Sequence, residues 1–90
     1  MDSVESAIVA EESGAGRVEL CAGLVEGGLT PSLAMIRAVR RVLTKTLLFV
    51  IIRPRGGDFL YSHHEFDIMR EDVKVPFSFS FLFSIAFAAS

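Results

Sequence analysis

A continuous apolar run of six residues, Leu47 to Ile52, limits most strongly what this chain can fold into. The length suits a strand better than a helix, and a strand without polar alternation is typical of one buried on both faces. Such strands occur mainly in parallel sheets, because crossover helices cover the two faces of those sheets. The run therefore predicts an α/β fold.

The segments before this run fit the same interpretation. Residues 2–13 are expected to form a helix that Asp2 caps, with Gly14 ending it in a left-handed turn. Residues 17–21 alternate in polarity and are expected to form a strand, with Val18 and Leu20 on one face.

Two further helix starts complete the pattern. Thr30 is expected to cap a helix that begins at Pro31, and Ser62 and Glu65 form the signature of a capping box for another. In that last helix Phe66, Met69 and Val73 are expected to face inward. The order helix, strand, helix, strand, helix predicts parallel β/α units with two strands and three helices.

Residues 75–90 differ from the rest because they contain no charged side chain. Phenylalanines alternate there with mostly small residues, and this period of two indicates an exposed or edge strand with one apolar face. A transmembrane helix needs about 20 apolar residues, so no membrane span is expected. Residues 1–74 are thus expected to form the β/α part, followed by an irregular or strand-like tail with the composition of aggregating segments.

The composition indicates which partners and which cellular compartment to expect. The formal net charge is −2 and the nine basic residues are scattered, so nucleic acid is not an expected partner. The single cysteine, Cys21, excludes an internal disulfide and suits a reducing compartment. The acidic N-terminus lacks the features of a secretory signal, so a cytoplasmic location is expected.

The loops that follow the two predicted strands, residues 22–29 and 53–61, should lie side by side, because parallel strands end at the same sheet edge. Glu19 and Cys21 should point away from Val18 and Leu20 near this edge. Glu19 is a candidate general base or ligand anchor, or else a structural ion-pair partner of a nearby arginine. Cys21 could bind a soft metal as a thiolate, but no neighbouring ligand motif distinguishes it from a buried core residue.

The string from Arg53 to Asp58 reads Arg-Pro-Arg-Gly-Gly-Asp and is the most informative stretch of the sequence. The guanidinium groups of Arg53 and Arg55 suit a carboxylate or phosphate, and the glycines allow a ligand to approach the backbone. The alternative is a tight turn in which Arg55 pairs with Asp58. His63 and His64 are adjacent at a helix start, so they cannot form the metal-binding pair of a zincin.

Several strings closely resemble the CutC family of copper homeostasis proteins: Arg17–Cys21, Glu26–Ser32, Ile52–Phe59, Tyr61–Ser62 and Met69–Asp72. The resemblance implies a TIM-type (β/α) barrel, a cytosolic role in copper tolerance and Cu(I) binding. It makes Cys21 a candidate copper ligand and implies that Glu19, Arg53 and Asp58 line the barrel mouth. The family's first strand and the strands after the third helix have no counterpart here, so we expect a partial barrel.

Three functional hypotheses remain open. The first is a copper homeostasis protein with Cys21 as a Cu(I) ligand. The second is an enzyme-like site for a small anionic or sugar-like ligand, in which Glu19 acts as a base, Arg53 and Arg55 hold the anion and no reaction is assignable. The third is a fragment without independent activity, because about 250 residues are needed for a complete barrel. Its exposed sheet edges would favour self-association.

Overall fold

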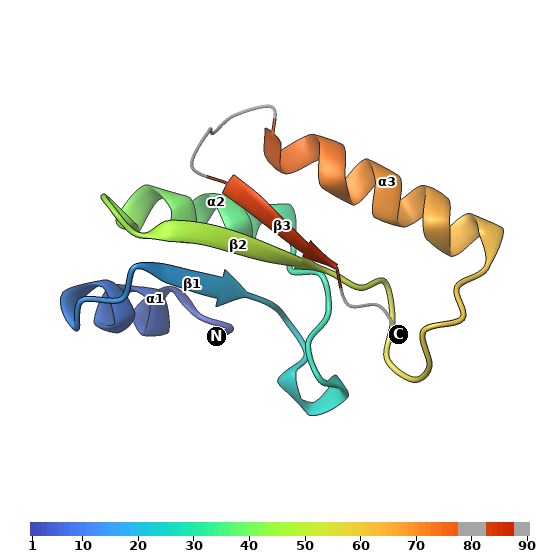
Figure 1. The fold of residues 1–90 in the computed structure, drawn as a ribbon, viewed down its shortest axis with the longest axis horizontal. Helices are drawn as coiled ribbons and strands as arrows, with labels where there is room; N and C mark the ends of the chain where they lie inside the picture. The colour runs from blue at the N-terminus through green and yellow to red at the C-terminus, as the bar shows by residue number, and fades with distance from the viewer. Residues whose placement is uncertain (78–82, 88–90) are drawn as a thin grey trace.

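The computed structural model describes residues 1–77 and 83–87, which form one parallel sheet with helices beside it (Figure 1). The elements in chain order are α1 (Val4–Glu12), β1 (Arg17–Leu20), the 3-10 turn η1 (Leu24–Glu26), α2 (Leu33–Val42), β2 (Leu47–Ile52), α3 (His63–Phe77) and β3 (Phe83–Phe87). The predicted alternation of helices and parallel strands is therefore confirmed.

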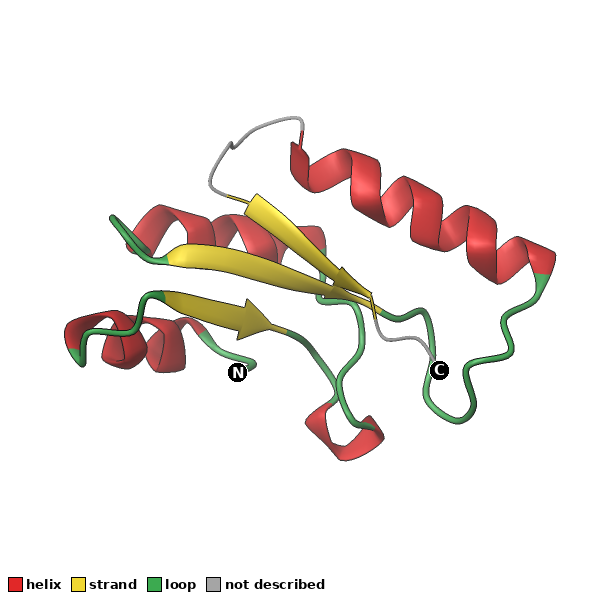
Figure 2. Cartoon of the chain, viewed as in Figure 1, coloured by secondary structure: helices red, strands yellow, loops and turns green. Residues whose placement is uncertain are grey.

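The sheet has the strand order β1-β2-β3, and both pairings are parallel (Figure 2). Val18 of β1 stands opposite Leu48 of β2, and Leu20 stands opposite Val50. These four side chains are buried, together with Ile36 and Val39 of α2 and Ala7 of α1. The core thus lies between the sheet and the helices.

The other face of the sheet, called the open face below, is only partly covered by the described residues. Burial alternates along β2, and Leu47 is 43% exposed, whereas its neighbour Leu48 is fully buried. Burial of the strand on both faces was therefore a wrong prediction for this chain, because the packed helices cover one face. Arg17 lies over the Phe49 ring, with 5.4 Å between the guanidinium carbon and the ring centroid.

The apolar tail supplies the third strand. In β3, Phe83, Ile85 and Phe87 stand in register with the buried positions Leu48, Val50 and Ile52 of β2. The predicted strand-like character is confirmed for residues 83–87, while residues 78–82 and 88–90 of the tail lie outside the described part. Helix α3 continues to Phe77, so the change of composition after residue 74 falls within a helix.

Two of the predicted helix caps are displaced along the chain. Ser3 caps α1 by accepting a hydrogen bond from the Ser6 amide, which starts the helix too late for Asp2 to cap it. Ser32, and not Thr30, caps α2 by accepting from the Met35 amide. The Thr30 hydroxyl is engaged elsewhere, in the site described below.

Helix α3 begins as predicted. Ser62 and Glu65 form a reciprocal capping box: the Ser62 amide donates to Glu65 Oε1 at 2.7 Å, and the Glu65 amide donates to Ser62 Oγ at 3.2 Å. Met69 is buried and Val73 packs against the core, as expected. Phe66 was wrongly predicted to face inward; it is 50% exposed and makes an edge-to-face contact with Tyr61.

Glu11 joins α1 to the turn before β2. Its carboxylate accepts hydrogen bonds of 2.9–3.1 Å from the amides of Thr44, Lys45 and Thr46, and another from the Thr44 hydroxyl. These bonds, that from the Lys45 amide first, lower the pKa of Glu11 from its usual 4.5 to about 2.

No helix within residues 1–77 and 83–87 combines the length and the apolar content needed to cross a membrane.

Candidate functional site

The loops after β1 and β2 meet at the carboxyl end of the sheet, as predicted. Thr30 links them: its hydroxyl donates to the Arg53 carbonyl at 3.1 Å and accepts from the Arg53 amide at 2.8 Å. The Thr30 amide also donates to the Arg53 carbonyl, at 3.0 Å. Ala22 and Leu29 close the first loop by exchanging two backbone hydrogen bonds. The two loops therefore form one connected unit.

Arg53 crosses between these loops and is 6% exposed. Its Nη1 donates to the carbonyls of Glu26 and Gly28, and its Nη2 donates to the Gly57 carbonyl at 2.9 Å. The guanidinium carbon lies 4.9 Å from the centroid of the Phe59 ring. Within the described part of the chain, Nε is buried and has no hydrogen-bond partner.

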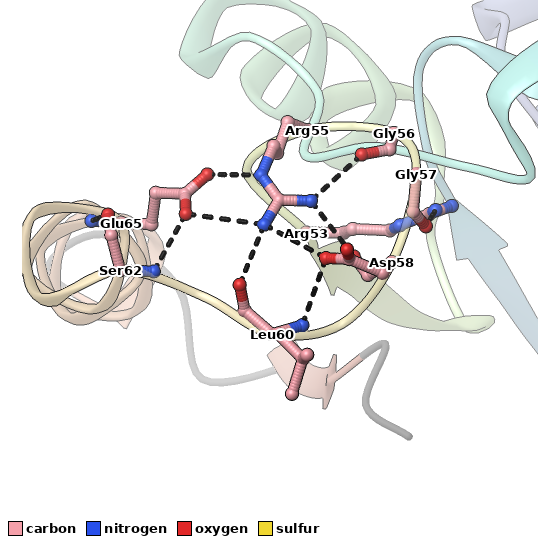
Figure 3. A network of polar contacts seen from close by, with 8 residues as sticks. All are labelled: Arg53, Arg55, Gly56, Gly57, Asp58, Leu60, Ser62 and Glu65. Atoms are coloured by element: carbon pink, nitrogen blue, oxygen red, sulfur yellow. Dashed lines mark hydrogen bonds and ion pairs between the residues drawn. The ribbon is translucent and has the colours of Figure 1, made fainter.

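Arg55, two residues further along, is saturated by partners from its own loop and from α3 (Figure 3). Its guanidinium donates to both carboxylate oxygens of Glu65, to Asp58 Oδ1, and to the carbonyls of Gly56, Asp58 and Leu60. The bond to Glu65 raises the pKa of Arg55, and the Ser62 amide and Arg55 lower the pKa of Glu65. The structure thus contains the predicted internal pair Arg55–Asp58, and an anion reaching Arg55 would have to replace one of these partners.

Glu19 lies on the open face of the sheet and is exposed. The ion pairs among the described residues include neither Glu19 with Arg17 nor Glu19 with Arg53. The Glu19 backbone carbonyl accepts a hydrogen bond of 2.8 Å from the Met1 amino group. The structure therefore places Glu19 beside the strand end without joining it to the arginine network.

Cys21 follows β1 directly and is buried, at 7% exposure. Its amide donates to the Met1 carbonyl at 2.9 Å, and its thiol lies 3.6 Å from the same oxygen. Gly28, at φ +101°, leaves one flank of the sulfur without a side chain, because a Cβ there would lie 3.6 Å from Sγ. Cys21 is thus buried, and at Gly28 its sulfur lies beside a residue that has no side chain.

The described residues contain no cluster of three or more His, Cys, Asp or Glu side chains that could hold a metal ion. Cys21 therefore offers one soft ligand and not a complete set. His63 and His64 are exposed at the start of α3, and His63 Nε2 lies 3.4 Å from Asp67.

The contacts that three residues of the site make with Arg53 were not predicted from the sequence. Thr30 was expected to cap a helix, and the carbonyls of Glu26 and Gly28 carry no side-chain signature. The glycine-rich context was the available signal, since a Cβ at Gly27 would come within 3.0 Å of Arg53 Nη1. The glycines of the first loop were therefore the sequence feature that indicated a close approach of its backbone to the arginine at the end of β2.

The sequence profile of the CutC family matches residues 1–82. The copper homeostasis protein cutC homolog of Mus musculus is 53% identical over 75 residues, which are 83% of this chain and 27% of the mouse protein. A CutC family protein of Bacteroides fragilis is 61% identical over 74 residues, 82% of this chain and 30% of that protein. The chain thus spans under a third of the length of these relatives.

Among solved structures, the fold is similar to that of a Streptococcus agalactiae protein, whose crystal structure is described as that of a proposed copper homeostasis protein CutC. The TM-score is 0.71 at 37% sequence identity, and the match covers 83% of this chain and 37% of the other. The parallel β/α arrangement is therefore shared with a solved member of that group.

Proposed function

Since this chain belongs to the CutC copper homeostasis family, we propose that it takes part in cytoplasmic copper homeostasis by binding Cu(I) through Cys21. The observation that carries the proposal is the position of Cys21. It lies at the carboxyl end of β1, where β/α folds place their ligands, and its sulfur lies beside Gly28, which has no side chain.

The chemistry of the donor supports copper as the cargo. A thiolate is a soft ligand and selects Cu(I) over the hard cations that carboxylates prefer. One thiolate does not fill the coordination of a Cu(I) ion, so a second soft donor has to join Cys21. A small-molecule thiol could supply it, and a bound complex would then contain one copper ion and one protein thiolate.

Competition with a chromogenic Cu(I) chelator under anaerobic, reducing conditions tests this proposal. The wild-type chain should take Cu(I) from the chelator, and Cys21→Ala should lose at least about tenfold in affinity, which corresponds to about 1.4 kcal/mol. The double variant His63→Ala, His64→Ala removes two exposed donors at a distant helix start and should bind as the wild type does. Equal affinities of wild type and Cys21→Ala would refute the role of Cys21.

The enzyme-like alternative makes a different prediction. If Glu19 acted as a base or ligand anchor, Glu19→Gln would impair the handling of a small ligand and leave the affinity for Cu(I) unchanged. The carboxylate of Glu19 is exposed and has no ion-pair partner among the described residues, and this neither requires nor opposes such a role. For the anion-binding part of that alternative, the relevant observation is that Arg53 Nε is buried without a hydrogen-bond partner among the described residues.

A further inference from the structure

Arg53 is a buried cation without an anionic partner in the described part of the chain. None of the ion pairs there includes it, although the residue is only 6% exposed. Its three hydrogen-bond acceptors are neutral carbonyls, and Nε has none. Burying a charge is costly unless it is paired, and each unsatisfied buried polar group calls for a physical explanation.

The neighbouring Arg55 provides an internal comparison. Both arginines belong to the same loop, yet the guanidinium of Arg55 donates from all three nitrogens and faces two carboxylates, Glu65 and Asp58 (Figure 3). Arg55 is therefore neutralised by one carboxylate of its own loop, Asp58, and one of α3, Glu65. Arg53 lacks such a partner while being the more buried of the two.

The surroundings of Arg53 are arranged before any ligand binds. Thr30 fixes the backbone of Arg53 through three hydrogen bonds, and the carbonyls of Glu26, Gly28 and Gly57 fix Nη1 and Nη2. A Cβ at position 27 would lie 3.0 Å from Nη1, so glycine there lets the guanidinium lie close to the loop backbone. Because these hydrogen bonds already fix the side chain of Arg53, it loses little further conformational entropy when Nε binds a ligand.

We propose that Arg53 is the anchor of a binding site for a small oxyanion, a carboxylate or a phosphate group, between the loops after β1 and β2. Nε and Nη2 form the side-on edge of the guanidinium that binds such groups through two parallel hydrogen bonds. Nε is buried and the Phe59 ring lies over the guanidinium, so the anion reaches this edge only when this part of the loop moves. The site does not depend on Cys21, and therefore stands apart from the copper proposal.

The test observes the Nε–H groups of the arginines by ¹⁵N NMR in the wild-type chain, so it does not depend on a variant that fails to fold. Inorganic phosphate and succinate are titrated separately, and sodium chloride controls for ionic strength. The Arg53 Nε–H resonance should shift and saturate with one of the two anions, which identifies phosphate or carboxylate as the group bound. The Arg55 Nε–H, already bonded to Glu65, should move little.

Two results would overturn the proposal. One is an Arg53 Nε–H resonance that neither anion shifts beyond the effect of chloride. The other is a magnetisation transfer from a bound water to Nε–H that persists in saturating anion, which would show that water satisfies this donor. The variant Arg53→Lys provides a second test, because lysine keeps the positive charge but lacks the edge with two parallel donors. If this variant folds, it should bind the same anion at least about tenfold more weakly than the wild type.

Discussion

Thr30→Val isolates the hydroxyl that connects the two loops. Valine keeps the shape of threonine but removes both side-chain hydrogen bonds to Arg53. The Arg53 carbonyl keeps the Thr30 amide as a donor, whereas the Arg53 amide loses its acceptor. Leaving a buried donor unsatisfied costs about 1–3 kcal/mol, so we expect the free energy of unfolding to fall by about that amount.

The loss should be measurable by urea denaturation and by melting. For a domain of this size a change of about 1 kcal/mol shifts Tm by about 4–8 °C, so Tm should fall by about 4–24 °C. Hydrogen exchange at the Arg53 amide should accelerate at the same time, because this amide is the donor left unpaired.

Thr44→Val is the matched control. The Thr44 hydroxyl also makes a side-chain hydrogen bond, to Glu11, but the residue is exposed. Substitutions at such positions usually change stability by less than about 0.5 kcal/mol. If the two variants lost equal stability, or if the Arg53 amide kept its protection, the connection between the loops would not depend on the Thr30 hydroxyl.

Two further predictions concern pH and the core. The pKa of Glu11 is lowered in the folded state, so its contribution to stability is present above pH 4.5 and is lost as the pH falls toward about 2. Unfolding followed by circular dichroism should show this loss in the wild type and a weaker pH dependence in Glu11→Gln; identical acid profiles would contradict it. Leu48→Ala should destabilise the chain by about 2–5 kcal/mol because Leu48 is fully buried, whereas Leu47→Ala, at its half-exposed neighbour, should cost clearly less. Similar losses in urea denaturation would show that the open face of the sheet is covered in solution.

Local patterns were predicted from the sequence more successfully than distant partners. The Ser62–Glu65 capping box and the Arg55–Asp58 pair each join residues three apart, so a short string contains both partners. Thr30 had the right residue type and context for a cap, but its hydroxyl binds Arg53, 23 residues away. A hydrogen bond to a residue so far away in the sequence cannot be predicted from the residues around Thr30.

The meeting of the two loops was predicted correctly, but the hydrogen-bond partners of their side chains were not predictable. Parallel strands end at one edge, so the meeting of the two loops followed from the order of the elements alone. The contrast between the paired Arg55 and the incompletely paired Arg53 depends on carbonyl groups, which every residue carries. The roles of Glu19, Arg53, Arg55 and Asp58 in ligand binding, and that of Cys21 toward copper, therefore remain predictions.

The strand order β1-β2-β3 also has a consequence for how the chain folds. Because both pairings among the three described strands are parallel, none of these strands forms a hairpin with another, and the paired positions of β1 and β2 are about 30 residues apart in sequence. Each pairing must therefore close a long loop before its contacts form, which slows folding relative to a helical chain of equal length. Until the third strand joins, β2 offers an unpaired edge to other molecules, so the refolding yield should fall as protein concentration rises.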